Sequence, residues 1–150
     1  MNFSIRDAYE TDSRELGEIA LAAKKTWDYP DSWYELWDET LGITENFITT
    51  NKVVVATINE KPAGFAAVRV NSRVADLEHM WVLPEYMNKG LGTALFREIV
   101  DFCRAIDVRK LRIESDPNAT GFYKKMGGRQ IGYVDSLPKP RKLPVFEIDI

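Results

Sequence analysis

The fold of this chain is decided at Val82-Leu83-Pro84-Glu85-Tyr86-Met87-Asn88-Lys89-Gly90-Leu91-Gly92-Thr93, where a strand runs through a glycine-containing turn into a long helix. The first N–H groups of a helix have no intrahelical partner and lie at the positive end of its dipole. Glycine at positions 90 and 92 removes the side chains that would keep an anion away from the backbone. The stretch therefore predicts a main-chain cradle for a phosphate or diphosphate group.

Two other glycine-rich phosphate sites fit this loop less well. A Walker P-loop needs Lys and Ser or Thr after its second glycine, whereas Thr93 and Ala94 follow Gly92, which excludes it. A dinucleotide fingerprint has a third glycine where this chain has Leu95, although Glu114 lies near the distance of its ribose-binding acid. That fold also needs more βα units than follow the loop. A plain strand–helix turn without a ligand stays open for the loop taken alone.

The hydrophobic pattern on both sides of the loop predicts a mixed α/β sheet with helices beside it. Apolar residues recur at helical spacing in some segments, and others are β-branched or alternate with period two. The predicted strands are 3–8, 52–58, 64–70, 74–83, 110–115, 130–134 and 143–150, and the predicted helices are 11–25, 31–41, 91–106 and 117–126.

The strand before the loop carries most of the candidate side chains. Side chains of a strand alternate between its two faces. Strict alternation places Leu77, His79 and Trp81 on one face of this strand, and Glu78, Met80 and Val82 on the other.

Composition limits the class of protein. The 150 residues, 45% hydrophobic and 29% charged, predict one globular domain over residues 1–150. No apolar run approaches the roughly 18 residues that span a bilayer, so we expect no membrane partner. The charged N-terminus predicts no signal peptide, and the single Cys103 agrees with a reducing, cytoplasmic location. A net charge of −3 argues against a nucleic-acid partner.

Several motifs in order give the chain a family resemblance. The family pattern Arg/Gln-x-x-Gly-x-Gly/Ala, after a strand ending Val-x-Pro-Glu-Tyr, is matched by residues 82–86 and 88–92. A second block, an Asn followed by Phe-Tyr and Gly, is matched by Asn118, Phe122, Tyr123 and Gly127. With the segments at 5–8 and 62–65, nearly the whole chain resembles the GNAT superfamily of N-acetyltransferases.

This resemblance implies a fold and an activity. The implied fold is α/β (α+β), a mixed, mostly antiparallel sheet of about seven strands flanked by about four helices. The implied enzyme moves an acetyl group from acetyl-CoA directly to a primary amine of a small molecule or a protein, without a metal. A homodimer is implied as well, because relatives often pair through their C-terminal strands. The alternative is a non-catalytic acyl-CoA-binding sensor or interaction module, which would need neither Tyr123 nor Glu78.

The resemblance also assigns the acetyl-CoA site. The strand before the loop would receive the pantetheine arm, with a backbone N–H near Val82 polarising the thioester carbonyl. The helix start would hold the diphosphate, and Asn118 would contact the arm. The implied cofactor-binding residues are Met80, Trp81, Val82, Asn88, Lys89, Gly90, Leu91, Gly92, Thr93, Asn118 and Tyr123.

Three residues are candidates for proton transfer. Tyr123 matches a family tyrosine that protonates the leaving thiolate, and its phenol has an ordinary pKa of about 10, close to that of a thiol. A core tyrosine bonded to a backbone carbonyl is the other interpretation. Glu78 is the candidate base, and Glu114 on the next strand is its rival, since some relatives place the base there. Either acid can instead be a solvated strand residue, and His79 is interpreted as a packed one.

The amine acceptor is not identified by the sequence. Aromatic residues concentrate in the first two helices, a region that forms one wall of the acceptor pocket in the family. Trp27 and Trp33 are therefore candidate substrate-binding residues, although the helical spacing of Trp33 and Trp37 favours a place in the core.

Two positions depart from the family pattern. Met87 stands where Arg or Gln is usual, and we expect binding to survive, because a backbone cradle needs no side chain there. Gly128 stands where Phe often follows Gly127, which is expected to alter packing beside the cofactor.

Overall fold

Seven strands and five α-helices form in the residues that the computed structural model describes, which are 2–150 without the side chains at positions 39 and 40. The strands are β1 (Ser4–Asp7), β2 (Lys52–Ile58), β3 (Lys61–Asn71), β4 (Val74–Val82), β5 (Lys110–Glu114), β6 (Arg129–Asp135) and β7 (Lys142–Asp149). The helices are α1 (Ser13–Lys24), α2 (Asp31–Leu41), α3 (Glu45–Thr50), α4 (Leu91–Ala105) and α5 (Thr120–Lys125). Single 3₁₀ turns lie at Glu10–Asp12, Pro84–Tyr86 and Pro117–Ala119.

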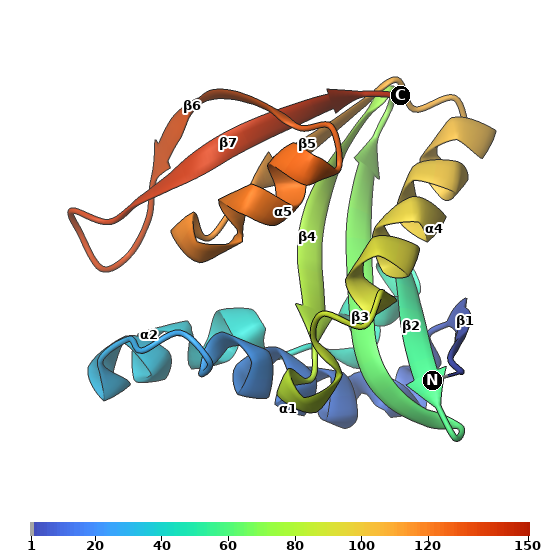
Figure 1. Cartoon of the computed structure of the whole chain (residues 1–150), viewed down its shortest axis with the longest axis horizontal. Coiled ribbons are helices and arrows are strands. Elements are labelled where there is room, and N and C mark those ends of the chain that lie inside the picture. Colours follow the sequence, from blue (N-terminus) through green and yellow to red (C-terminus); the bar gives the residue numbers. More distant parts are fainter. Residues whose placement is uncertain (1) are drawn as a thin grey trace.

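The strands form one sheet in the order β1-β2-β3-β4-β5-β7-β6 (Figure 1). Only β4 and β5 run parallel, and every other neighbouring pair is antiparallel. The prediction of a mixed, mostly antiparallel sheet of about seven strands is confirmed. The predicted hairpin between β2 and β3 turns at Asn59 and Glu60, whose positive φ angles of 51° and 67° suit the right-handed twist of the flanking strands.

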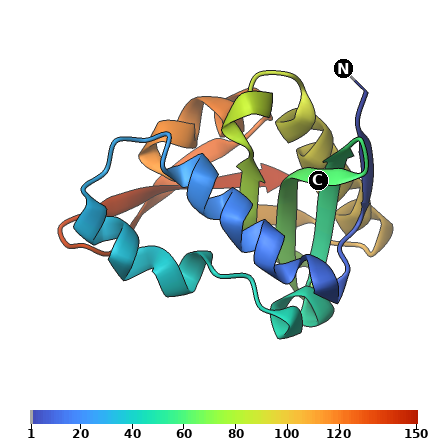
Figure 2. The same cartoon turned by 90° about the horizontal axis from the view of Figure 1, so that it is seen from below.

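Each face of the sheet has its own hydrophobic core. Helix α4 packs on one face through Leu95, Ile99 and Cys103, all of which are fully buried. The opposite face is covered by α1 and α2, and Figure 2 shows α1 lying across it. Because Cys103 is buried among apolar side chains, the pKa of its thiol is raised to about 11, so it serves as packing. In the described part of the chain, we find no helix with the length and hydrophobicity needed to cross a membrane.

Helix α3 was not predicted, so the expected number of about four helices was one too low. It has only six residues, too few for a helical period to stand out. A cap begins it, since the Thr44 side chain accepts a hydrogen bond from the Phe47 N–H (3.0 Å). In the sequence, Thr44 before Glu45 is the one feature that could have indicated the start of this helix.

Strict alternation along β4 was wrong, because the strand carries a β-bulge. Leu77 pairs with Val68 and His79 with Ala67, so Glu78 has no partner on β3. The extra residue reverses the pattern. Leu77 therefore belongs to the core on the α4 side together with Met80 and Val82, instead of sharing a face with His79.

Candidate active site

The site begins where β4 and β5 separate. Their parallel pairing ends at Leu77 and Ile113, after which β5 stops at Glu114 and β4 continues to Val82 (Figure 1). The last five residues of β4 therefore keep an edge without a neighbouring strand. Such an edge offers N–H and C=O groups to an extended ligand.

The backbone groups of Val82 point toward this open edge. The Leu83 N–H donates to the Ala63 carbonyl on the β3 side (2.8 Å). Successive residues of a strand direct their N–H and C=O groups to opposite edges, so those of Val82 and Met80 face away from β3. This orientation is the one that the predicted role of the Val82 N–H requires.

The turn after β4 prepares the start of α4 for an anion. Asn88 and Gly90 have φ angles of 61° and 90°, and Gly90 is the N-cap of α4. The first hydrogen bond of the helix runs from the Ala94 N–H to the Gly90 carbonyl (3.1 Å). The N–H groups of residues 91–93 come before this bond and have no intrahelical acceptor. They lie at the positive end of a helix of 15 residues.

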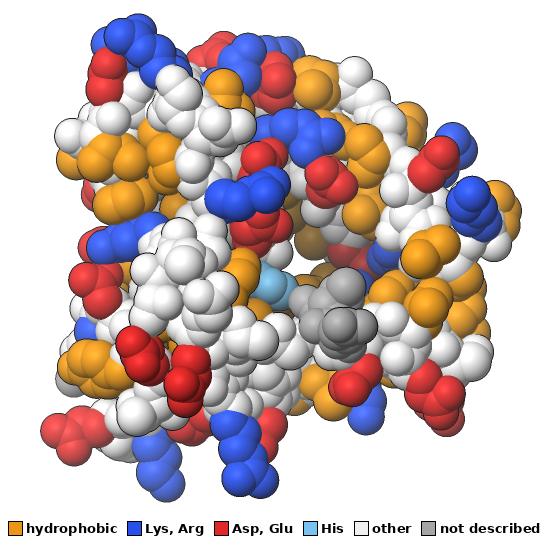
Figure 3. Space-filling view, turned by 180° about the vertical axis from the view of Figure 1, so that it is seen from behind, with side chains coloured by type: hydrophobic (Ala, Val, Ile, Leu, Met, Phe, Trp, Pro, Cys, Tyr) orange, Lys and Arg blue, Asp and Glu red, His pale blue; other side chains and the backbone are white. Residues whose placement is uncertain are grey.

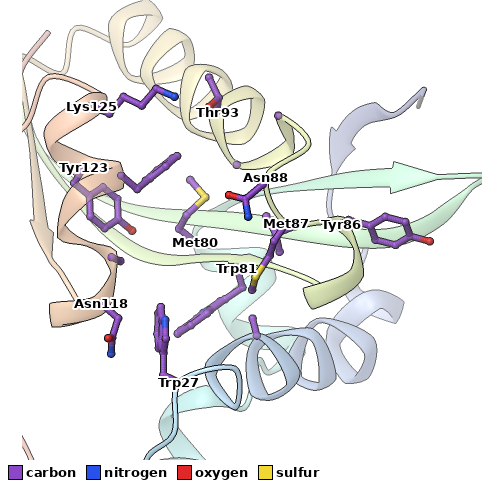
Figure 4. Close-up of a pocket in the computed structure, with 16 residues that line it drawn as sticks. Trp27, Met80, Trp81, Tyr86, Met87, Asn88, Thr93, Asn118, Tyr123 and Lys125 are labelled. Carbon is purple, nitrogen blue, oxygen red and sulfur yellow. The ribbon is translucent and has the colours of Figure 1, made fainter.

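A cleft of about 520 Å³ lies between the open edge of β4, the start of α4 and helix α5. Its volume is within the range of pockets that bind a cofactor-sized molecule. In Figure 4 most of the labelled side chains converge on it from β4, the turn before α4, α5 and Trp27 after α1, whereas the ring of Tyr86 points away from the others. The lining residues are Ala23, Trp27, Met80, Trp81, Val82, Tyr86, Met87, Asn88, Gly90, Gly92, Thr93, Asn118, Ala119, Phe122, Tyr123 and Lys125.

The structure brings nine of the eleven predicted cofactor-binding residues to this cleft. The exceptions are Lys89 and Leu91, which do not line it. Leu91 is 1% exposed and packs in the core, so only its backbone N–H is available at the helix start. Lys89 is exposed to solvent. The prediction missed Lys125, whose ammonium adds a positive charge to the cleft, because nothing in the sequence ties it to the loop.

Close contact with the backbone of Tyr123 explains why position 128 is a glycine. Its N–H donates to the Tyr123 carbonyl (2.8 Å), and a Cβ at this position would lie 2.7 Å from that oxygen. A larger residue would push the end of α5 away, so glycine keeps Tyr123 in place. Met87 lines the cleft with its thioether, next to the cradle (Figure 4).

Tyr123 lines the cleft with its hydroxyl unengaged. The residue is buried, yet the hydroxyl makes no hydrogen bond to any described residue, and Figure 4 shows it directed into the cleft. This excludes the core tyrosine bonded to a backbone carbonyl. Burial first, and then the negative charge of Asp116, hold the pKa of Tyr123 well above its ordinary value. The phenol is therefore protonated at neutral pH and free to donate.

The two rival carboxylates occupy the same small cavity. A pocket of about 80 Å³ adjoins the cleft and is lined by Glu78, Glu114 and Tyr123 among others. Glu78 forms an ion pair with Arg69 (2.9 Å), and Glu114 accepts from Arg112 (2.6 Å). The side chain of Glu78 is 31% exposed and that of Glu114 46%. Burial raises the pKa of Glu78, and nearby Asp76 and Glu114 add to this against the opposing effect of Arg69.

His79 is a packed residue, as interpreted from the sequence. Its Nδ1 accepts a hydrogen bond from Trp81 Nε1 (3.0 Å), and its ring meets those of Phe47 and Phe65. Burial, followed by the charge of Lys24, lowers the pKa of His79 to about 4. The imidazole is therefore neutral at pH 7 and orients the Trp81 ring.

The predicted aromatic wall divides between cleft and core. Trp27 lines both cavities, and its ring lies 6.0 Å from that of Trp81. Trp33 lines neither cavity and stacks on Tyr29 at 5.3 Å. Trp37 is buried, as its helical spacing indicated.

A buried polar network behind Asn118 was missed by the sequence analysis. Asp116 forms an ion pair with Arg141 (2.8 Å), and the two side chains are 7% and 9% exposed. Tyr29 donates its hydroxyl to Asp116, and Asn118 Nδ2 donates to the same hydroxyl (2.9 Å). This network joins the proline-rich connection before β7 to the turn before α5, and it orients Asn118 at the cleft. No local motif signals it, because its members lie up to 112 residues apart in the numbering from Tyr29 to Arg141.

Comparison with known proteins agrees with this geometry. Residues 10–128 match the model of the acetyltransferase (GNAT) family. A Bacillus subtilis (strain 168) protein, provisionally named as a ribosomal protein bS18-alanine N-acetyltransferase, is 35% identical over 68 residues, 43% of this chain and 45% of that protein. An uncharacterised N-acetyltransferase of Methanocaldococcus jannaschii is 28% identical over 83 residues, 49% of this chain and 37% of that protein. The chain thus spans less than half the length of these curated relatives.

Solved structures share the fold over the whole chain. A PaiA N-acetyltransferase from Thermoplasma acidophilum, in complex with coenzyme A, superposes with a TM-score of 0.85 at 19% identity, covering 100% of both chains. The ribosomal-protein-S18-alanine N-acetyltransferase from Escherichia coli superposes with a TM-score of 0.74 at 20% identity, covering 99% of this chain and 94% of the other. At this level of identity the likeness concerns the fold alone.

Proposed function

Because the chain belongs to the acetyltransferase (GNAT) family, we propose that it is an acetyl-CoA-dependent N-acetyltransferase acting on a primary amine of a small molecule or a protein. One observation carries the proposal. The open edge of β4 leads directly to a bare helix start, and the hydroxyl of Tyr123 lies free between them. In acetyl-CoA, an extended arm joins the acetyl thioester to a diphosphate. The open strand edge, the Tyr123 hydroxyl and the helix start are arranged to meet the arm, the thioester sulfur and the diphosphate.

The cleft fits coenzyme A by its shape and its donors. The N–H groups at the start of α4 would hold the diphosphate, with the Lys125 ammonium adding a positive charge. The Met80 and Val82 backbone would pair with the pantetheine amides along the open edge, as a neighbouring strand would. Asn118, held by Tyr29 and Asp116, would contact the same arm.

Three groups would then carry out the transfer. Bound acetyl-CoA supplies the activated acetyl group. Glu78 takes a proton from the acceptor ammonium, directly or through water, so that the amine nitrogen can bond to the carbonyl carbon. The Val82 N–H donates to the carbonyl oxygen as negative charge develops there. Tyr123 gives its proton to the sulfur as the carbon–sulfur bond breaks, and the second proton, which the nitrogen loses as the amide forms, returns through water to the Tyr123 oxygen.

Replacing Glu78 by Gln should slow transfer mainly at low pH. Glu78 acts as a base only when deprotonated, and its raised pKa places the acidic fall of the rate above the ordinary value of 4.5. Without this base, the rate follows the deprotonation of the acceptor amine itself, so the fall moves to higher pH. We expect a loss of about 100-fold near pH 6 that shrinks as pH rises, measured as kcat/KM against pH.

The matched control is Glu114→Gln, which removes the other carboxylate of the same small pocket. Both substitutions preserve side-chain size, and thermal melting curves check that both variants fold. If Glu114→Gln moves the acidic fall and Glu78→Gln does not, the base is Glu114. Unchanged profiles for both variants would refute a carboxylate base.

The test of the function itself is a screen of primary amines with acetyl-CoA, read as release of free thiol. Calorimetric titration with acetyl-CoA, NAD and ATP accompanies it, because each nucleotide would compete for the same cradle. Acetyl-CoA binding with thiol release supports the enzyme. Binding of acetyl-CoA without transfer to any amine would instead identify a non-catalytic acyl-CoA-binding module.

The proposed homodimer would use the C-terminal end of the sheet, where β6 is the edge strand next to β7. Strand β6 is the last strand of the sheet and exposes the side chains of Ile131 and Tyr133. Pairing there would cover these apolar groups. Sedimentation or light scattering of the chain and of an Ile131→Glu variant would test this expectation.

A further inference from the structure

Lys24 is a buried cation that forms no ion pair with any of the described residues. It lies at the end of α1, is 9% exposed, and its Nζ is 3.9 Å from the centroid of the Trp37 ring. A second indole, that of Trp81, lies 5.8 Å away. Within the described residues, its ammonium makes no hydrogen bond and no ion pair. Contact with ring faces stabilises a cation only in part.

The carboxylates of this region are already engaged by arginines. Asp116 is paired with Arg141, Glu78 with Arg69, and Glu114 with Arg112. The neighbouring imidazole of His79 is neutral at pH 7, with a pKa of about 4. Asp76 also pairs with both Arg69 and Arg112 (3.6 Å each), so these carboxylates are satisfied by arginines and, among the described residues, none forms an ion pair with Lys24.

The ammonium form of Lys24 persists at neutral pH in spite of its burial. Burial first, and then the charge of Arg141, lower its pKa to about 8, against the opposing effect of Asp116. Most of the side chain is still protonated at pH 7. Burying such a charge lowers the stability of the fold unless an ion pair or hydrogen bonds compensate for the lost water. Leu16 and Ala20 occupy the same helix face at intervals of four residues, so an apolar residue at position 24 would simply extend the core.

Lys24 itself lines neither cavity, but residues next to it do. Ala23 and Trp27, its neighbours in the chain, line the cleft, and Trp81 lines the cleft and the smaller pocket. Lys24 is thus one indole ring away from the space that Glu78 and Tyr123 share. Figure 3 shows, on the side opposite to the view of Figure 1, a hollow that reaches the only histidine of the chain. His79 is close enough to Lys24 for the ammonium charge to lower the histidine pKa, so an acceptor that entered by this hollow would approach Lys24.

We propose that Lys24 is the anion-binding residue of the acceptor site, and that the acceptor is a small primary amine that also carries a carboxylate. The carboxylate is held by the Lys24 ammonium, and the amine lies toward Glu78. The surrounding indoles of Trp27, Trp37 and Trp81 exclude water and strengthen the ion pair. A polyamine presents a second cation to Lys24 and is disfavoured. This inference rests on the proposed N-acetyltransferase function and narrows its substrate class.

The test compares amino acids with their decarboxylated amines. Ornithine and putrescine, lysine and cadaverine, and phenylalanine and phenethylamine are offered in pairs to the wild-type chain, to Lys24→Met and to Lys24→Arg. Lys24→Met keeps the length and removes the charge, whereas Lys24→Arg keeps the charge. In at least one pair, we expect the wild type to prefer the carboxylate-bearing member, and Lys24→Met to reduce this preference in kcat/KM by about 10- to 100-fold. Lys24→Arg should retain much of it.

A binding measurement keeps this inference separate from the proposed function. Titration of the CoA-bound protein with each amine, followed by tryptophan fluorescence, reports the acceptor site without any turnover. Failure of the wild type to bind acetyl-CoA would overturn the proposed function. Normal acetyl-CoA binding, with no pair in which the carboxylate-bearing member binds more tightly, would overturn the role of Lys24 alone. So would an equal loss for both members of every pair in Lys24→Met, or acetylation of Lys24 itself found by mass spectrometry.

Discussion

Gly92→Glu should abolish acetyl-CoA binding and leave the fold intact. Gly92 is the second residue of α4, and a Cβ there would meet Phe122 at 3.5 Å, an ordinary contact. A glutamate at a helix start is favoured by the helix dipole, so the free energy of unfolding should not fall. Its carboxylate would, however, lie where the diphosphate is held. Two like charges about 4 Å apart repel by about 4 kcal/mol near a protein surface, which weakens binding by roughly a thousandfold.

Calorimetric titration with acetyl-CoA measures this loss, and two variants control for it. Gly92→Ala adds only the Cβ and should cost far less affinity. Gly121→Glu adds the same charge at the start of α5, where a Cβ meets nothing within 4 Å and the residue does not line the cleft. Position 90 is less suitable, because its φ of 90° would strain any larger residue and confuse folding with binding. Undiminished affinity of Gly92→Glu would disprove the helix-start cradle.

Tyr123→Phe should lower kcat by about 100- to 1000-fold, as expected for the loss of a positioned general acid. The hydroxyl has no protein partner among the described residues, so its removal breaks no hydrogen bond of the fold. Its raised pKa keeps the hydroxyl protonated before the transfer but makes it a weaker acid than a free phenol, so it donates only as the basic thiolate forms. The phenyl ring still packs against Phe146 and Phe122, so the affinity for acetyl-CoA should change little. Steady-state rates and a parallel titration separate the two effects.

An exposed tyrosine supplies the control for this substitution. Tyr133→Phe on β6 removes a hydroxyl far from the cleft and should leave kcat unchanged. Wild-type turnover in Tyr123→Phe would assign Tyr123 to packing. An equal loss of affinity and turnover would mean that the hydroxyl binds acetyl-CoA without donating its proton.

The cradle could be predicted from the sequence because it is local. Gly90, Gly92 and the start of α4 lie within a few residues, and the order of strand, turn and helix places the free N–H groups without help from distant contacts. Asn118 and Tyr123 could be placed through a second short motif. Most helices and strands could also be located from their hydrophobic period, because that period is a local property of the sequence. Helix α3 is the exception, since its six residues are too few to show a helical period.

Contacts between distant segments decided the rest of the site. The bulge at Glu78 depends on the register in which β4 pairs with β3. This register cannot be predicted from the sequence of either strand alone. The ion pair of Asp116 with Arg141, and the enclosure of Lys24 by Trp37 and Trp81, join segments far apart in the chain. The sequence alone thus determined the position of a helix start whose backbone N–H groups are available to an anion, since helix geometry follows from neighbouring residues. Only the tertiary structure decided which charges of the described residues are paired and that the buried ammonium of Lys24 is not, because burial and ion pairing depend on distances that folding sets.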